Sequence, residues 1–357
     1  MQMRNDFARW SEYFIKESFM RWLVTGGVGF IGTNLVTHLI ETGNDVVIID
    51  DMSRIGVDLN AKFLKEKFGI KPNKIDVSRN DDLLPFLRKQ TKFDVVAHLA
   101  GQVSLLESIK DPMRDFAVNA QGTLNILNYI RTASSETILL GMSSNKLYGD
   151  LNKIKFSETD TRYVATDWPN GFNESLPLDF HGPYGCSKGV ADQYLADFSR
   201  TYGLRTASLR QSSVYGPHQH PRSDQGWVTH LVTEAIYGQE IQLNGIGKQV
   251  RDLLHAVDLA KLFVLLAKNI SLFSTHQFNV GGGQSNSLSI LELFLRLEQT
   301  LGIKVVFKTG PERPSDQKVF ISDNSAVTAL TGWQPEINLD FGLSQLVESV
   351  RSKKDTG

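Results

Sequence analysis

Short apolar runs alternate with helical patterns along most of the chain, beginning at Met20. Most of these runs lack alternating polar positions, which is typical of strands that helices cover on both faces. We expect strands at residues 22–25, 45–50, 73–76, 95–99, 137–142 and 206–210. We expect helices at 32–42, 81–90, 115–132 and 184–202. Strands that alternate with helices predict βαβ units, and therefore an α/β fold with a parallel sheet.

Three regions depart from this pattern. Residues 1–19 interleave aromatic and charged positions, and we expect an N-terminal extension without a role in the chemistry. The long polar segment 149–183 interrupts the alternation, and loops of such length are often functional. Beyond residue 271 the pieces become shorter, and Ser289 with Glu292 has the form of a capping box that opens a helix. We divide the chain into an extension at 1–19, a main domain at 20–268 and a smaller C-terminal lobe at 269–357, with contributions to the lobe from 150–182 and 213–250.

Composition excludes several classes of protein. The 357 residues include 38 Lys and Arg against 39 Asp and Glu, a balance that argues against a nucleic-acid or polybasic membrane surface. The single cysteine cannot form an intrachain disulfide or a Cys-based zinc site, which fits a reducing compartment. No apolar run approaches the roughly 18 residues that span a bilayer. We expect a cytoplasmic protein with no nucleic-acid partner, no membrane partner and no metal.

A glycine loop follows the first expected strand and opens the first helix. Gly26, Gly29 and Gly32 have the spacing G-x-x-G-x-x-G. The first glycine permits a tight turn, the second lets the backbone approach a pyrophosphate, and the third lets helix and strand pack closely. The helix N-terminus then faces the anion. The loop in this context predicts a Rossmann-type, doubly wound sheet that binds a dinucleotide.

The second expected strand ends at Asp50, about 20 residues beyond the loop. An acid at this place accepts hydrogen bonds from the adenosine ribose, and its charge would repel a 2′-phosphate. Asp50 therefore favours NAD over NADP. Arg54 favours NADP instead, because its positive charge could neutralise a 2′-phosphate.

Tyr184 and Lys188 stand four residues apart, directly after Pro183, which suits a helix start. This spacing places both side chains on one helical face. A phenol is a poor base at neutral pH, but a nearby ammonium and a positive nicotinamide would favour the phenolate. Ser144, at the end of another expected strand, could hydrogen-bond the same substrate hydroxyl. Together these residues indicate an oxidation in which Tyr184 removes a hydroxyl proton.

The glycine loop, Ser144, Tyr184 and Lys188 together resemble the extended short-chain dehydrogenase/reductases that act on nucleotide sugars. The resemblance runs from Met20 almost to the end. It makes 20–268 an NAD-binding domain and 269–357 mainly a substrate-binding lobe. It implies cofactor contacts from Gly26, Gly29, Phe30, Ile31, Gly32, Asp50, Asp51, Ser53, Arg54, Asp76, Val77, Leu99, Ala100, Gly101, Tyr184, Lys188 and Gln211.

Longer blocks outside the cofactor motifs resemble one group within this family, the CDP-paratose 2-epimerases (CDP-tyvelose epimerases). The blocks lie at 101–103, 143–150, 169–171, 178–189, 224–227, 247–252 and 315–317. This resemblance implies tightly held NAD and epimerisation at C2 of a CDP-3,6-dideoxyhexose. The C2–H is too weakly acidic for direct abstraction, whereas oxidation of C2 to a ketone and return of the hydrogen to the other face inverts the centre without net redox change.

The resemblance also assigns roles. Tyr184 is base and then acid, Lys188 is its electrostatic support and a ribose ligand, and Ser144 positions the hydroxyl. The group usually has Thr at Ser144, which keeps the hydroxyl. It usually has His at Gln211, beside the expected nicotinamide site, so this change bears on the sugar preference.

The substrate contacts follow from the same resemblance. Arg251 and Arg313 match arginines that bind the diphosphate, and Asp316 could hold the nucleotide ribose or orient Arg313. For Arg251 the alternative is a surface ion pair with Asp252, and for Asn119 it is a structural hydrogen bond to buried backbone. His181 could equally be a capped loop residue. The expected sugar contacts are Gln102, Asn119, Ser144, Asn170, His181 and Ser213.

Three alternatives remain at this point. A nucleotide-sugar 4,6-dehydratase usually carries an Asp-Glu pair where this chain has Asn145 and Lys146. A UDP-hexose 4-epimerase would share the Ser, Tyr and Lys and differ only in the pocket. A non-catalytic NAD-binding regulator commonly loses the Tyr or the Lys. The family also implies a homodimer or homotetramer, paired through the helices at 115–132 and 184–202.

Overall fold

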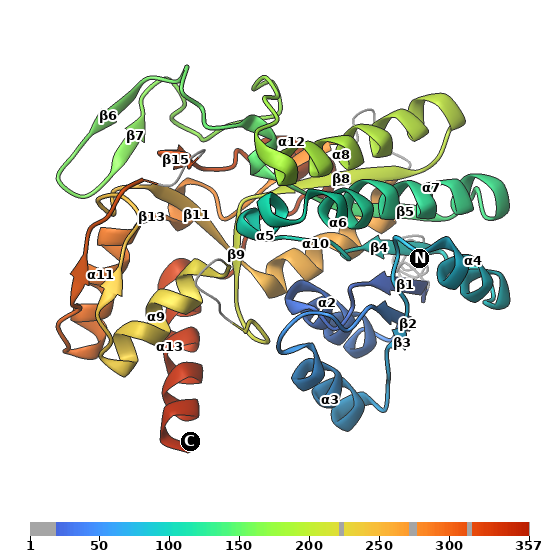
Figure 1. The fold of residues 1–357 in the computed structure, drawn as a ribbon, viewed down its shortest axis with the longest axis horizontal. Coiled ribbons are helices and arrows are strands. Elements are labelled where there is room, and N and C mark those ends of the chain that lie inside the picture. The colour runs from blue at the N-terminus through green and yellow to red at the C-terminus, as the bar shows by residue number, and fades with distance from the viewer. Residues whose placement is uncertain (1–18, 221–224, 271–276, 313–315, 357) are drawn as a thin grey trace, which may run out of the picture.

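The computed structural model describes residues 19–220, 225–270, 277–312 and 316–356. Nearly all of the extension expected at 1–19 therefore lies outside the described residues. A seven-stranded parallel sheet, in the order β12-β8-β5-β4-β1-β2-β3, forms the centre of the described structure (Figure 1). Its strands are β1 (Arg21–Thr25), β2 (Asp45–Asp50), β3 (Asn73–Lys74), β4 (Val95–His98), β5 (Ile138–Ser144), β8 (Thr206–Gln211) and β12 (Gln277–Val280). The expected α/β fold with a doubly wound parallel sheet is confirmed.

The strand order reverses at β1. This strand pairs with β2 on one side and with β4 on the other, so Thr25 lies opposite both Ile49 and His98. In an open α/β sheet, a crevice forms at such a reversal, outside the carboxyl ends of the strands. The glycine loop begins at this end of β1, which places it in the crevice.

Two layers of helices cover the sheet. Along β1, Trp22 and Val24 belong to one buried cluster and Leu23 to another, so the strand is apolar on both faces. The first cluster includes residues of α2 (Phe30–Glu41), α3 (Val57–Phe68) and α10 (Ala256–Asn269). The second includes residues of α4 (Asn80–Lys89), α7 (Gly122–Ala133) and α8 (Gly182–Tyr202). This burial explains the uninterrupted apolar runs in the sequence.

A smaller lobe lies beside the main sheet (Figure 1). Its four-stranded sheet consists of β9 (Ser213–Tyr215), β11 (Val250–His255), β13 (Ser287–Ser289) and β15 (Val319–Phe320). Shorter pairs are formed by β6 (Phe156–Glu158) with β7 (Tyr163–Ala165), and by β10 (Ile241–Gln242) with β14 (Phe307–Lys308). Its helices are α9 (Trp227–Tyr237), α11 (Ile290–Leu301) and α13 (Leu339–Thr356). The capping box expected at Ser289 and Glu292 is confirmed at the start of α11.

Two elements differ from the sequence-based expectation. The helix expected at 115–132 begins earlier and divides into α6 (Pro112–Phe116), a π-helical turn η1 (Ala117–Gln121) and α7. The segment 269–357, expected to be mainly lobe, also supplies β12 to the main sheet, and α12 (Ser325–Thr331) contributes Val327 to a core cluster of that sheet. Among the described helices, none combines the length and the apolar character that crossing a membrane requires.

Candidate active site

A cavity of about 660 Å³ occupies the crevice at the strand reversal. It extends from the glycine loop and the end of β2 to the start of α8. All residues that the family resemblance assigned to the cofactor line this cavity, as do Ser144 and Gln102. One continuous cleft therefore holds the expected dinucleotide contacts and the three expected catalytic side chains.

The glycine loop makes the sharp turn between β1 and α2. Gly26 has a left-handed backbone (φ 66°), and its N–H donates to the carbonyl of Ile49 on the neighbouring strand at 2.8 Å. A Cβ at Gly26 would lie 2.7 Å from the backbone nitrogen of Ala100, and a Cβ at Gly32 would clash with the carbonyl of Gly26. Because both neighbours are backbone, no side-chain movement relieves these clashes. The turn brings bare backbone and the N-terminus of α2 to the cleft, an arrangement that accepts a pyrophosphate.

Asp50 stands at the end of β2 with its carboxylate at the cleft. It accepts hydrogen bonds from the backbone N–H groups of Met52 at 2.9 Å and Val28 at 3.3 Å. Burial raises the pKa of this carboxyl above its ordinary value. These contacts fix the side chain where the sequence motif requires a ribose acceptor.

Arg114 is a cleft residue that sequence reasoning missed. Its guanidinium lies 2.9 Å from Asp51 and 2.7 Å from Asp76, and so joins the loops that follow β2 and β3. Both acids were expected to contact the cofactor, and all three side chains line the cavity. The partners are 63 and 38 residues away in sequence, so no local spacing pattern could have indicated the contact.

Tyr184 and Lys188 lie on the first turns of α8, and Ser144 ends β5. The phenol of Tyr184 hydrogen-bonds with Ser144, and burial raises the pKa of Tyr184 to about 12. Lys188 Nζ donates to the carbonyl of Met142 at 2.7 Å, and burial lowers the pKa of Lys188 to about 8. The expected constellation therefore assembles, while burial by the protein alone makes the phenol a weaker acid than an exposed tyrosine.

Asn119, on the π-helical turn, organises the loop that follows β4. Its Oδ1 accepts from the N–H of Gln102 and its Nδ2 donates to the carbonyl of the same residue, both at 3.0 Å. Nδ2 also donates to Ser187 Oγ on α8 at 3.0 Å. Asn119 is buried and lies outside the cavity lining. These contacts match the alternative considered for Asn119, a structural hydrogen bond to backbone. Gln102 itself lines the cavity.

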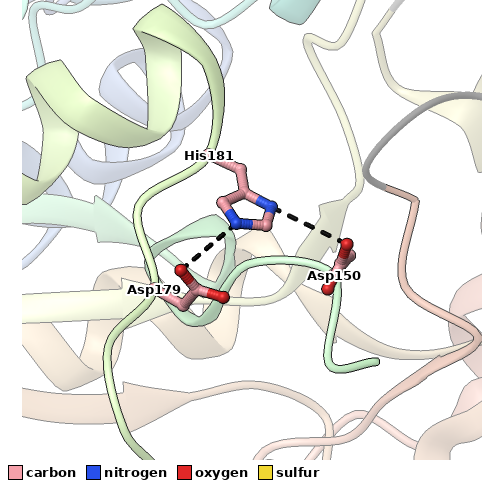
Figure 2. A group of neighbouring side chains, drawn as sticks. All are labelled: Asp150, Asp179 and His181. Atoms are coloured by element: carbon pink, nitrogen blue, oxygen red, sulfur yellow. Dashed lines mark ion pairs between the residues drawn. The ribbon is translucent and has the colours of Figure 1, made fainter. Parts of the chain in front are cut away.

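Three other expected sugar contacts lie outside the lining of the described cavity. Asn170 is exposed in the loop after β7, and Ser213 Oγ accepts a hydrogen bond from Trp227 Nε1 at 3.1 Å. His181 lies between two carboxylates, with Nε2 3.2 Å from Asp179 and Nδ1 3.8 Å from Asp150 (Figure 2). Sugar contacts by Asn170, Ser213 and His181 stay predictions.

The group of His181, Asp150 and Asp179 fastens both ends of the long excursion between Ser144 and Tyr184. Asp179 N–H donates to the carbonyl of Leu147 at 2.8 Å, beside the point where the excursion leaves. Both ring nitrogens of His181 face carboxylates, an arrangement suited to an imidazole that bridges two acids (Figure 2). We therefore interpret this group as a set of polar contacts that closes the loop.

Asp316 connects two cations, of which Lys146 lines the cavity, whereas Arg251 and Asp316 lie outside its lining. Its Oδ1 accepts from Arg251 Nη2 at 2.7 Å and lies 3.5 Å from Lys146 Nζ. Asp252 is buried and accepts from the N–H groups of Gly283 and Ser322, so Arg251 does not form the ion pair with Asp252 that was its alternative. Arg313 lies outside the described residues. Lys146 lines the cavity but was not expected to face the substrate. Its ion pair with the distant Asp316 is what identifies it as a candidate substrate contact.

Comparisons with known proteins agree with this geometry. Residues 22–281 match the model of the NAD dependent epimerase/dehydratase family. The chain belongs to this family. A CDP-paratose 2-epimerase of Salmonella typhi is 40% identical over 334 residues, which cover 92% of this chain and 98% of that protein.

Two solved structures have the same fold as this chain, each with a TM-score of 0.77 and 27% sequence identity. One is the UDP-glucose 4-epimerase of Thermus thermophilus in complex with NAD, matched over 93% of this chain and 99% of that one. The other is the UDP-glucose 4-epimerase of Thermotoga maritima with UDP-glucose, matched over 94% of this chain and 100% of that one. These matches extend through the smaller lobe.

NAD is the cofactor of this family, and the cleft fits it. Gly26 and Gly32 leave a cradle that a Cβ would fill, and Asp50 offers a carboxylate to the ribose. At the other end, Gln211 lines the cavity, and within the described part of the chain its buried Oε1 has no hydrogen-bond partner. Gln211 therefore presents an acceptor beside Ser144, where the family's nicotinamide is expected.

Proposed function

We propose that the protein is an NAD-dependent nucleotide-sugar 2-epimerase that interconverts CDP-paratose and CDP-tyvelose. The observation that carries this proposal is the 40% identity to a CDP-paratose 2-epimerase along nearly the whole of both chains. The identity covers more than the cofactor half, since 98% of that protein is matched. The assembled Ser144, Tyr184 and Lys188 support a catalytic protein over a non-catalytic regulator.

The residues after Ser144 favour epimerisation over elimination. A 4,6-dehydratase needs an additional acid and base, and this chain has Asn145 and Lys146 in the expected places. Asn145 Nδ2 donates to Gln317 at 2.7 Å, and Lys146 pairs with Asp316, so both side chains connect to the lobe. Neither an amide nor an ammonium in these contacts can serve as the carboxylate base of an elimination.

The protein's own groups have distinct tasks in this reaction. When bound, NAD supplies the transient oxidation of the sugar at C2 and its reversal. Ser144 and Tyr184 hold the C2 hydroxyl between them, and Tyr184 takes its proton and later returns one. The ammonium of Lys188 favours the phenolate of Tyr184. Arg251 and Lys146 provide positive charge for the diphosphate, which a guanidinium can bind through two hydrogen bonds.

The proposed assembly is a homodimer or homotetramer. Two tyrosines of α8, Tyr194 and Tyr202, are 39% and 48% exposed, so the helix expected to pair carries accessible aromatic surface. Measurement of the molar mass in solution checks this expectation.

A panel of nucleotide sugars tests the proposed activity. The purified protein is incubated separately with CDP-paratose, UDP-glucose and UDP-galactose, and the products are identified by NMR. We expect inversion at C2 of CDP-paratose and no conversion between the two UDP-hexoses. Conversion of UDP-glucose to UDP-galactose, with CDP-paratose unchanged, would contradict the proposal and identify a 4-epimerase.

An isotope experiment tests the mechanism. With CDP-paratose deuterated at C2, the deuterium should stay at C2 of the product in ordinary water, because the removed hydrogen is returned to the same carbon. Loss of the deuterium to water would indicate proton abstraction and overturn the oxidative route.

Denaturation of the purified protein should release NAD, since the cofactor must stay bound through turnover.

A further inference from the structure

The ammonium of Lys188 is enclosed by protein. Lys188 is 7% exposed, and its Nζ donates to the carbonyl of Met142 at 2.7 Å. The same nitrogen lies against Gly101, where an added Cβ would be 3.5 Å from it. A charge in such a place is costly unless an opposite charge compensates it. A nearby carboxylate must therefore compensate the charge of Lys188.

Two acids act electrostatically on Lys188, namely Asp192 and Asp115. Asp192 follows Lys188 by one turn of α8, but Arg210 engages both of its oxygens: Nη2 lies 2.7 Å from Oδ2 and Nε lies 3.1 Å from Oδ1. Both residues are buried, and Asp192 has no exposed surface. Arg210 therefore compensates the charge of Asp192, and of the two acids Asp115 has the larger effect on the pKa of Lys188. The charge of Asp115 remains.

Asp115 contacts the π-helical turn through Asn119. It lies on α6, just before η1, and has no exposed surface. Its Oδ1 accepts from Asn119 Nδ2 at 3.2 Å, and Asn119 in turn donates to Ser187 Oγ, the residue next to Lys188. Ser187 also interacts with this carboxyl, and across the described residues the buried Oδ2 of Asp115 has no hydrogen-bond partner of normal geometry. A buried carboxylate oxygen without a donor is costly, and a function explains why it is kept.

We propose that Asp115 is a positioning residue of the active site, whose carboxylate balances the buried charge of Lys188 and keeps the ammonium in place beside Tyr184. The inference rests on the proposed function only in requiring Tyr184 and Lys188 as the catalytic pair. It holds for a 2-epimerase and a 4-epimerase alike. Asp115 acts through Lys188 and has no contact with the substrate in this role.

The charges around the pair determine the direction of the effect. Lys188 faces Asp115 from α6, Asp192 from its own helix and His98 from β4, and Tyr184 also interacts with Arg54. The negative charge of Asp115 raises the pKa of Lys188 and that of Tyr184. Removal of this charge should therefore lower both pKa values. The whole pH–rate profile should move toward lower pH.

The test compares Asp115→Asn with Asp197→Asn in the holoenzyme. Asp197 is a partly exposed acid of α8 that pairs with Arg200, so its variant makes the same change of net charge away from the site. NMR of ¹³C-labelled lysine follows the titration of Lys188, which is assigned by comparison with Lys188→Met. We expect the pKa of Lys188 to fall by about 1–2 units in Asp115→Asn, the size typical of a lost opposite charge nearby. It should stay unchanged in Asp197→Asn.

This measurement needs no substrate, so its result does not depend on the identity of the sugar. The pH dependence of kcat, on whichever nucleotide sugar is turned over, should move by a similar amount in Asp115→Asn. An unchanged pKa of Lys188 in that variant would overturn the proposal. If Asp115→Asn does not fold, ¹³C NMR of the aspartate carboxyls in Lys188→Met decides: the pKa of Asp115 should rise without the ammonium, and an unchanged value would overturn the proposal.

Discussion

Asp316 accepts a hydrogen bond from Arg251 at 2.7 Å, and the same carboxylate oxygen lies within ion-pair distance of Lys146. Arg251 comes from β11 of the lobe, whereas Lys146 lies in η2 (Asn145–Tyr148), directly after the strand that carries Ser144. A single acid thus holds two cations from different parts of the fold near each other. In the proposed function, this arrangement supplies positive charge for the diphosphate before the substrate arrives.

Replacement of Arg251 by Gln should weaken substrate binding. Loss of a charged hydrogen bond to phosphate costs about 1.5–3 kcal/mol, which corresponds to roughly a 10- to 100-fold rise in KM. The NAD content should not change, because the glycine loop and Asp50 line the cavity whereas Arg251 lies outside its lining. Lys248→Gln, which removes a cation paired with Glu158, is the control and should keep the KM of the wild type. An unaltered KM in Arg251→Gln would exclude Arg251 from the diphosphate site.

Replacement of Tyr184 by Phe should lower kcat by about 10²–10⁴-fold, because the variant cannot accept the hydroxyl proton. NAD should still be released when the purified variant is denatured. Tyr194→Phe removes an exposed phenol from the same helix and should turn over normally. A Tyr184→Phe protein with nearly normal kcat would refute the role of this phenol.

Replacement of Gly32 by Ala should reduce both stability and NAD content. The new methyl group would clash with the carbonyl of Gly26 and the backbone of Gly27, so α2 must move away from β1. Overpacking of this kind costs about 1–3 kcal/mol. Urea unfolding and the nucleotide released on denaturation measure the two effects.

Gly185→Ala is the matched control for this change. The nearest atom to its Cβ would be the carbonyl oxygen of Lys146 at 3.5 Å, an ordinary contact. This variant should keep the stability and the NAD content of the wild type. Equal behaviour of the two glycine variants would show that the backbone clash at Gly32 is unimportant.

His98 should make the stability of the protein decrease in mild acid. It is buried between Thr25 Oγ1 at 2.8 Å and Thr123 Oγ1 at 3.1 Å, and burial lowers its pKa from 6.5 to about 3. Between these values the unfolded chain binds a proton that the folded protein does not, so the free energy of unfolding falls as the pH falls. From pH 7 to pH 5 this group should remove about 2 kcal/mol.

Urea unfolding at the two pH values checks this effect in His98→Gln. The variant should lose less stability than the wild type over the same interval, because no imidazole titrates at this position. His230→Gln, a partly exposed histidine of α9, is the control and should retain the dependence of the wild type. Identical pH dependence in the wild type and His98→Gln would contradict the assignment.

Local features of the chain were predictable because their causes are local. The glycine spacing, the capping box at Ser289 and the four-residue step from Tyr184 to Lys188 each act within one or two turns of chain. Features that depend on distant partners were not predictable. Arg114 finds Asp51 and Asp76 only after β2, β3 and α6 have come together, and β12 is recognisable as a sheet strand only by its pairing with β8.

The π-helical turn shows the same limit. The segment 115–132 has an ordinary helical pattern, and nothing in its spacing indicates a change of hydrogen bonding at Ala117–Gln121. The turn brings Asn119 into contact with both Gln102 and Ser187, which lie on other elements. The role of Asn119 was therefore open from sequence, since both of its alternatives required knowledge of what lies opposite.

The excursion between Ser144 and Tyr184 leaves and re-enters the main domain at neighbouring points, because Asp179 is hydrogen-bonded to Leu147. With its two ends fastened, its length and content can change at little entropic cost to the rest of the fold. Between these ends the excursion is also tied to the lobe, since Phe172 packs against Phe320 of β15 and Arg162 pairs with Glu292 of α11. A change in the length of the excursion should therefore act on the lobe, while Ser144 and Tyr184 stay anchored in β5 and α8.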